Sequence, residues 1–133
     1  MQSREQQYAA SVYTRVDNFR RDHPDEKDKD RKRYGAMAHK LPILVRQAGL
    51  VQALAFVHSR NKTPTNQLLS DLAQTVGAET TANLLNRSRQ ADLVEYIYLT
   101  DQVMLALKWY KRFAQSVLKV ESTDEGNDGG GND

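Results

Sequence analysis

Cysteine is absent from this sequence of 133 residues. Without cysteine the chain has no disulfide bonds, no thiolate metal sites and no thiol nucleophile. Long apolar runs are absent as well, since no segment reaches the roughly 18 to 20 consecutive apolar residues that a membrane-spanning helix needs. The first residues also lack the apolar core of a signal peptide. We therefore expect a cytoplasmic protein that does not enter a membrane.

Recognisable catalytic motifs are missing too. The sequence has no Gly-rich phosphate loop, no nucleophile elbow and no Cys–His arrangement. His23, His39 and His58 are too far apart to form a helical ligand pair, so we interpret them as surface or capping residues. Asp92 and Glu95 can share a helix face, but one such pair is weak support for a two-metal site. We expect a protein that is not an enzyme and uses no cofactor or metal.

Charge is unevenly distributed, although the formal net charge is only +2. Residues 121–133 hold five of the 17 acids and none of the 19 bases, so residues 1–120 carry a net charge of +7. Two internal stretches lack acids, and their bases are Arg31, Lys32, Arg33, Lys40, Arg46, Arg60 and Lys62 in the first and Lys108, Lys111, Arg112 and Lys119 in the second. Such stretches suit phosphates, although they also occur in proteins that bind no nucleic acid.

Apolar residues recur at spacings of three and four, and no segment alternates with period two, so we expect helices throughout. The first helix is predicted over 3–21, with an apolar side formed by Tyr8, Val12, Tyr13, Val16 and Phe19. Further helices are predicted over 50–59, 63–76, 81–87 and 90–119, the second of these with Thr63 as cap before Pro64.

The second predicted helix has its apolar stripe at Tyr34, Met37, Ala38, Leu41, Leu44, Val45 and Ala48. The stripe keeps its phase through Pro42, so we predict a kink there and not a break. Gly49 is expected to cap this helix in the left-handed conformation. Residues 25–33 carry acids first and bases last, which suits a helix that begins near Pro24, but they can equally form a solvated loop.

The predicted fold is therefore all-α, a small single-domain bundle of about five to six helices in residues 1–120. Residues 121–133 are acidic and rich in glycine, with no apolar side chains to bury, and are expected to be a disordered tail.

The bases of two helices fall on polar faces when they are projected at about 100° per residue. On the last helix Lys108 and Arg112 lie beside Gln115, Lys119 and, more loosely, Lys111, opposite the apolar Ala106, Tyr110 and Val117. On the second helix the two polar rows are Arg33, Lys40 and Gln47, and Lys32, His39 and Arg46. Both faces can also be explained as the solvated sides of core helices, and charge alone does not decide between the two interpretations.

Two segments resemble a known family. The first runs from Tyr34 to Phe56 and contains Gly-Leu-x-x-Ala-Leu-Ala-Phe, and the second contains Leu-Ala-Leu-Lys-Trp-Tyr-Lys-Arg-Phe-Ala at 105–114. Both resemble the small all-helical subunit of the type III-B CRISPR effector complex, the Cmr module. The similarity extends from the first helix to about Val117 and excludes the acidic tail.

This resemblance implies a non-catalytic subunit that stacks with copies of itself into a short filament along a guide RNA and its paired target RNA. It also implies contacts with the other Cmr subunits, including the backbone subunits and the large polymerase-like subunit. Base pairing would supply sequence specificity, and basic side chains would hold the RNA backbone. The residues that we expect to bind RNA are Lys40, Arg46, Lys108, Lys111 and Arg112.

Aromatic residues are not included among the residues expected to bind RNA. Trp109 is interpreted as partly buried in preference to stacking on a base. Phe56 and Tyr96 are left open between the core and an interface with another copy.

Two other functions are compatible with the residues. One is a helical protein-interaction adaptor without nucleic-acid contact, whose basic faces only provide solubility. The other is a small helical DNA-binding regulator, which is less favoured because neither Gly49 nor Gly77 marks a persuasive helix-turn-helix.

Overall fold

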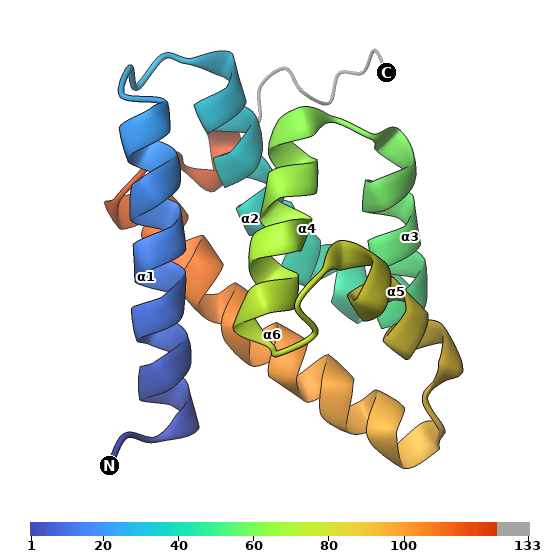
Figure 1. The fold of residues 1–133 in the computed structure, drawn as a ribbon. Helices are drawn as coiled ribbons and strands as arrows, with labels where there is room; N and C mark the ends of the chain where they lie inside the picture. Colours follow the sequence, from blue (N-terminus) through green and yellow to red (C-terminus); the bar gives the residue numbers. More distant parts are fainter. Residues whose placement is uncertain (125–133) are drawn as a thin grey trace.

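The structure, a computed structural model, describes residues 1–124, which form six α-helices, one 3₁₀ turn and no strand. The elements are α1 (Arg4–Asp22), α2 (Lys29–Ala48), α3 (Leu50–Arg60), α4 (Thr63–Thr75), α5 (Thr81–Gln90), α6 (Leu93–Ser116) and η1 (Ser122–Asp124) (Figure 1). The prediction of a small all-α fold is confirmed. Of the expected tail, 121–124 are described and include η1, whereas 125–133 lie outside the described residues.

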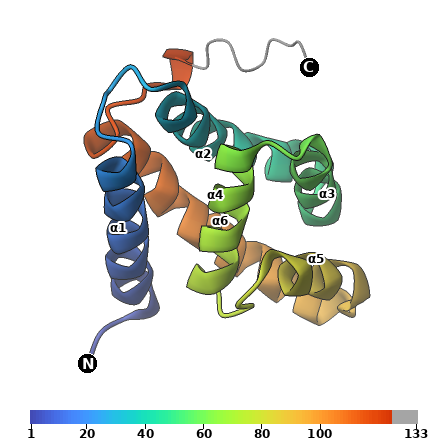
Figure 2. The ribbon, with the colours of Figure 1, turned by 45° about the horizontal axis from the view of Figure 1, so that its top comes forward.

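The helix α6 is the longest helix of the described residues, with 24 residues. It packs along α1 and α2 and also contacts α4, while α5 packs against α3 and α4. Figure 2 shows α6 passing behind α4, with α1 on one side and α5 near its N-terminal end. Large apolar side chains from α2, α4 and α6 are fully buried between these helices, among them Leu41, Leu68, Leu72, Leu107 and Tyr110.

The helix α1 begins with a capping box. The hydroxyl of Ser3 accepts a hydrogen bond from the backbone N–H of Gln6, and the Gln6 side chain accepts one from the Ser3 N–H. Four of the five predicted stripe residues are buried, namely Tyr8, Val12, Val16 and Phe19. The prediction for the fifth, Tyr13, is wrong, because it is 48% exposed and its ring packs only edge-on against Phe113, with centroids 5.4 Å apart.

The helix α2 starts later than Pro24. Asp28 is its N-cap, with its carboxylate accepting bonds from the backbone N–H groups of Asp30 at 2.7 Å and Arg31 at 3.1 Å. Of the two alternatives for residues 25–33, the acidic beginning is therefore a loop and the basic end is helical. As predicted, the helix continues through Pro42.

Gly49 joins α2 to α3 as a single-residue connection. Its φ of 90° is positive, as predicted, but its ψ of 160° is not that of a left-handed cap. The reason is that α3 begins at the next residue, so Gly49 is the C-cap of one helix and the N-cap of the other. This extended conformation with positive φ is accessible essentially only to glycine.

Two further helix ends differ from the predictions. The N-cap of α4 is Lys62, and Thr63 already belongs to the helix, because Pro64 fits within the first turn without needing a backbone partner. The helix α6 is shorter than predicted. It begins after Asp92, whose carboxylate accepts a bond from the Glu95 N–H at 2.9 Å, and it ends at Ser116, before Lys119 turns the chain with φ 62°.

A buried polar contact links α2 to α4. Tyr34 is fully buried and its hydroxyl donates a hydrogen bond to Asp71 Oδ2 at 2.6 Å, while Gln67 Nε2 donates to Asp71 Oδ1 at 2.9 Å. Burial raises the pKa of Asp71, although these two hydrogen bonds act in the opposite direction. The pair shows that the tyrosine assigned to the core also carries a specific polar contact.

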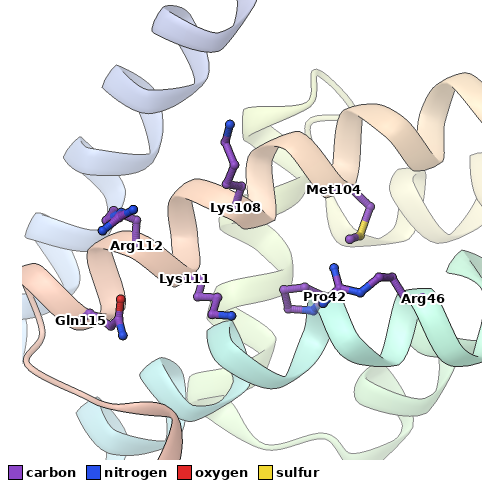
Figure 3. Close-up of a pocket in the computed structure, with 7 residues that line it drawn as sticks. All are labelled: Pro42, Arg46, Met104, Lys108, Lys111, Arg112 and Gln115. Atoms are coloured by element: carbon purple, nitrogen blue, oxygen red, sulfur yellow. The ribbon is translucent and has the colours of Figure 1, made fainter.

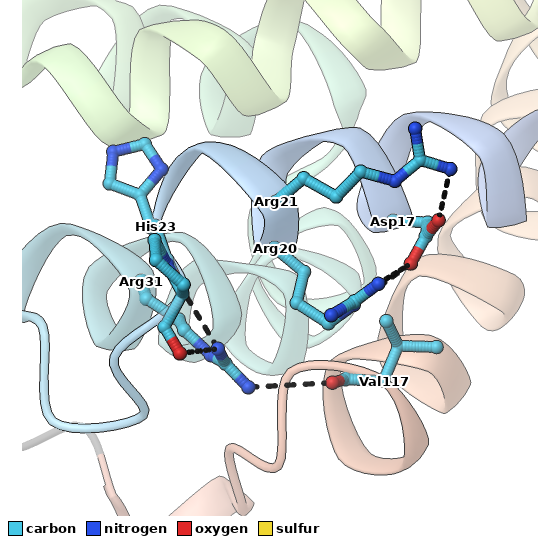
Figure 4. A network of polar contacts seen from close by, with 7 residues as sticks. Asp17, Arg20, Arg21, His23, Arg31 and Val117 are labelled. Atoms are coloured by element: carbon cyan, nitrogen blue, oxygen red, sulfur yellow. Dashed lines mark hydrogen bonds and ion pairs between the residues drawn. The ribbon is translucent and has the colours of Figure 1, made fainter.

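Arg31 holds the C-terminal ends of α1 and α6 together. It is only 3% exposed, and its guanidinium donates to the carbonyl oxygens of Leu118 at 3.0 Å, His23 at 3.1 Å and Pro24 at 3.2 Å. Figure 4 shows the contacts of Arg31 with the carbonyl oxygens of His23 and Val117. Nearby on α1, Arg20 donates a hydrogen bond to Asp17 and lowers the pKa of that carboxyl. Arg31 belongs to one of the acid-free stretches of the sequence, but its charge is used inside the protein.

The segment after α6 is fastened to α2 at a second point. His39 is 4% exposed, and its Nε2 lies 2.8 Å from the carbonyl oxygen of Val120, so this nitrogen carries the hydrogen. One turn away, Gly35 lies so close to Val120 that a Cβ at Gly35 would be 2.6 Å from the Val120 Cβ. The interpretation of His39 as a surface or capping residue, in a polar row of the second helix, is wrong, because the returning C-terminal segment covers it.

Candidate nucleic-acid interface

A groove with a volume of about 430 Å³ lies between α2 and α6 (Figure 3). Its lining residues are Pro42, Arg46, Met104, Lys108, Lys111, Arg112 and Gln115. Four of the seven are bases, and they come from two helices that the fold packs against one another. We call this cavity the basic groove.

The helical repeat of α6 produces one side of the basic groove. Lys108, Lys111 and Arg112 are exposed, whereas Tyr110 between them is fully buried in the core. The expected arrangement of a basic stripe opposite an apolar side is therefore present in the structure. Arg46 reaches the groove from the last turn of α2 and is exposed as well.

One of the four bases is already neutralised. The Lys108 ammonium forms an ion pair with Glu5 on α1 and also lies 5.6 Å from the centre of the Trp109 ring. Arg46, Lys111 and Arg112 have no ion pair within residues 1–124. The positive charge open to an external ligand is therefore concentrated on these three side chains.

Lys40, the fifth residue expected to bind RNA, does not line the basic groove. It is half-buried on α2, at a heptad spacing from Arg33, and its neighbour His39 faces the C-terminal segment. Lys119 also lies outside the groove because α6 ends before it. The structure thus gathers four of the five predicted residues and separates the fifth.

Trp109 is partly buried, in agreement with its interpretation from the sequence. Its ring stacks on Phe113 with centroids 5.6 Å apart. Packing against Phe113 therefore accounts for the burial of the ring without a bound base, while its Nε1 is buried with no hydrogen-bond partner in residues 1–124.

One group of possible metal ligands occurs within residues 1–124, formed by His23, Asp28 and Asp30, whose ligand atoms lie within 4.8 Å of one another. Each has another role. His23 stacks on Phe19 at 4.1 Å, Asp28 caps α2, and Asp30 lies 4.0 Å from Arg33. The interpretation of His23 as a capping residue agrees with its position at the end of α1, and we assign no metal to this group.

Comparisons with known proteins found a matching family model, a similar protein and a similar solved structure. The family model "CRISPR-associated protein (Cas_Cmr5)" matches residues 4–117. The chain belongs to the Cas_Cmr5 family. A protein of Thermus thermophilus named CRISPR system Cmr subunit Cmr5 is 43% identical over 119 residues, which are 90% of this chain and 99% of that protein. The crystal structure of a Cmr5 family protein from the same organism matches with a TM-score of 0.79 and 44% identity, over 88% of this chain and 98% of that one.

Membership of the Cas_Cmr5 family confirms the resemblance found in the sequence. The matched region contains every residue of the basic groove and ends before the acidic tail. None of the helices in residues 1–124 is long and apolar enough to cross a membrane.

This Cmr5 family member has a second surface that the sequence analysis did not identify. Four apolar side chains in the first two turns of α6 are more than half exposed, namely Leu93 at 73%, Val94 at 76%, Ile97 at 53% and Tyr98 at 52%. We call these four residues the apolar patch. A contiguous exposed group of this kind is typical of an interaction surface.

The two aromatic residues that the sequence left open are now distinguished. Phe56 is 45% exposed, with the Arg60 guanidinium 5.6 Å from its ring centre. Tyr96 is partly buried, and its hydroxyl accepts a hydrogen bond from the backbone N–H of Val51 at 3.1 Å. Tyr96 thus packs against the core and bonds to α3, whereas Phe56 is on the surface.

Proposed function

We propose that this chain is a non-catalytic subunit of a Cmr-type, RNA-guided effector complex and that its basic groove binds the RNA backbone. The observation that carries the proposal is the convergence of Arg46, Lys111 and Arg112, none with an ion pair within residues 1–124, on one groove between α2 and α6. Their side chains are positively charged and offer several N–H donors each, which suits phosphate oxygens.

The groove suits a sequence-independent contact. Its bases come from exposed sides of helices, and its uncharged lining consists of Pro42, Met104 and Gln115. Sequence would be read by pairing between guide and target, and the protein would recognise charge and backbone shape. Each copy would contribute only a few phosphate contacts, so binding would depend on several copies acting along one RNA.

The partners of this role are those of the family. The relative from Thermus thermophilus is named a Cmr subunit. By analogy we infer assembly with the other Cmr subunits, including the backbone and the large polymerase-like subunit, and contact with guide and target RNA.

Stacking with copies of itself forms part of the proposal. The apolar patch supports it, because its four side chains are each more than half exposed to water and a neighbouring subunit could cover them. The patch and the basic groove lie at different positions along α6, so a neighbour on the patch would leave the groove open.

The decisive experiment measures RNA binding by the assembled complex at several salt concentrations. The groove variant replaces Arg46, Lys111 and Arg112 by Gln. Lys108 is left unchanged because its removal would unpair Glu5 and disturb the contact between α1 and α6. The control variant replaces three exposed bases outside the groove, Lys27, Arg87 and Arg89, by Gln. Both variants therefore lose the same charge.

The groove variant should bind RNA at least about tenfold more weakly at low salt, for unrelated guide sequences alike, while the control stays close to wild type. Loss of three phosphate contacts should also reduce the slope of log affinity against log salt by about 2. If both variants bind like wild type, the groove is only a solvated surface. The chain would then be better described as a helical adaptor without nucleic-acid contact.

A further inference from the structure

Lys108 lines the basic groove, but its charge is directed elsewhere. Its ammonium forms an ion pair with the Glu5 carboxylate on α1. Figure 3 shows its side chain pointing away from Arg46 and Lys111. The groove therefore contains a fourth base that becomes available to an external ligand only when the contact with Glu5 opens.

The position of Glu5 is fixed by neighbouring contacts that do not involve this ion pair. Arg4 Nη1 donates a hydrogen bond to the Tyr98 hydroxyl at 2.7 Å, and Gln102 Nε2 donates one to the Tyr8 hydroxyl at 3.2 Å. Tyr8 is also buried in the core. The first two turns of α1 are therefore attached to α6 on both sides of Glu5 in the sequence, and α1 would stay in place if the ion pair opened.

The ion pair is of a kind that opens easily. The side chains of Lys108 and Glu5 are 58% and 45% exposed, so water and salt screen their attraction. Lysine carries its charge on a flexible four-carbon stem, so the ammonium can turn toward the groove without movement of the backbone. A phosphate oxygen is a charged acceptor like the carboxylate, so it can replace Glu5 as the partner.

A phosphate in the basic groove would lie close to this base. Lys111 and Arg112 follow Lys108 by three and four residues, so the three side chains occupy neighbouring positions on one side of α6. Lys111 and Arg112 have no ion pair among the described residues. A phosphate held by either of them would be within about one helical turn of Lys108.

We propose that Lys108 is a fourth phosphate ligand of the basic groove, which Glu5 holds in reserve until an RNA phosphate takes the place of its carboxylate. This inference rests on the proposed function, because it assigns a further ligand and its regulation to the same site. Glu5 acts as an internal competitor, so RNA has to break one ion pair in each copy whose groove it enters. The chain therefore binds RNA more weakly than its four groove bases alone would allow.

Removing the competitor tests this inference. Glu5→Gln frees Lys108, and the matched control Asp101→Asn removes the same charge seven residues before Lys108, on the same side of α6. Asp101 is exposed and forms no ion pair within residues 1–124, so the control measures the general effect of losing a nearby acid. Binding of target RNA to the assembled complex is measured between low and high salt, and circular dichroism verifies that each variant is folded.

At low salt Glu5→Gln should bind RNA at least about threefold more tightly than wild type, because several copies each lose an ion pair that competes with RNA. Asp101→Asn should change the affinity by less than about twofold. The gain should shrink as salt rises, because salt already screens the ion pair in the wild type. In a Lys108→Gln background Glu5→Gln should give no gain, since no ammonium is released.

Three outcomes would overturn the inference: an equal gain in Asp101→Asn, a gain that persists without Lys108, or no gain at all. The proposed function fails separately. If the groove variant loses RNA binding but Glu5→Gln gives no gain, the groove remains an RNA site without a reserve ligand. If the groove variant binds RNA like wild type, the proposed function itself is wrong.

Discussion

Gly35→Ala should destabilise the protein, although alanine is the better helix former. In an exposed helix interior the change would stabilise by about 1 kcal/mol. Here the new Cβ would lie 2.6 Å from the Cβ and 2.8 Å from both Cγ atoms of Val120, far inside the ~3.5–4.0 Å of normal carbon contacts. The Val120 Cβ is next to the backbone, so the C-terminal segment would have to move as a whole.

The magnitude follows from two costs. Overpacking of a buried site costs about 1–3 kcal/mol. Displacing Val120 also strains the hydrogen bond from His39 to Val120 and the bond from Arg31 to Leu118. A hydrogen bond from a charged group such as the Arg31 guanidinium is worth about 1.5–3 kcal/mol. After the gain in helix propensity, we expect a net loss of about 1–3 kcal/mol. For a chain of this size the melting temperature should fall by about 4–12 °C.

Thermal unfolding followed by circular dichroism measures this loss, and Val120→Gly provides the control background. That substitution removes the three atoms that a Cβ at Gly35 would meet. In this background Gly35→Ala should be neutral or slightly stabilising. If Gly35→Ala raises the melting temperature in the wild-type background, the close approach of the two segments does not constrain the fold.

Three other perturbations test the stability, assembly and chemistry of the chain. Burial raises the pKa of Asp71, so the folded state takes up this proton at a higher pH than the unfolded state. As the pH falls from 7 to about 4, wild type should therefore gain stability relative to Asp71→Asn in urea unfolding. A difference in stability that does not change with pH would contradict this. Val94→Lys should weaken self-association in analytical ultracentrifugation while a Lys substitution at exposed Ala82, outside the patch, should not, and equal effects would exclude the apolar patch as the contact. Purified protein with Mg²⁺, Mn²⁺ or Zn²⁺ should not cleave RNA above background, and cleavage that disappears with His23→Ala would show that the group around His23 is catalytic.

Helices could be predicted from this sequence because their evidence is local. The stripe through Pro42 identified α2 as one helix, and the apolar positions Tyr8, Val12, Val16 and Phe19 identified α1. Gly49 was harder, because its conformation depends on α3 starting at once. The start of α2 was ambiguous for a similar reason, since the charge pattern of residues 25–33 fits a loop and a helix equally well.

The site could be predicted only in part. The 100° repeat was sufficient to place Lys111 and Arg112 on one exposed side of α6. It could not show that Glu5, 103 residues away, pairs with Lys108, or that a returning segment buries His39. These outcomes depend on tertiary contacts between distant parts of the chain, and no periodic pattern in a single helix records them. The apolar patch was missed because apolar residues at the start of α6 look the same in sequence whether covered or exposed.

The helix α6 has a geometric consequence for any assembly of copies. It carries the apolar patch near its beginning and the basic groove toward its end, about 20 Å further along at 1.5 Å per residue. Because one continuous helix joins them, the offset between the two surfaces is set by the helical rise and is the same in every copy. A stack formed through the patch would therefore behave as a ruler, with successive grooves repeating at a constant interval and orientation. Any guide and target bound by such a stack would have to match that interval over its whole length.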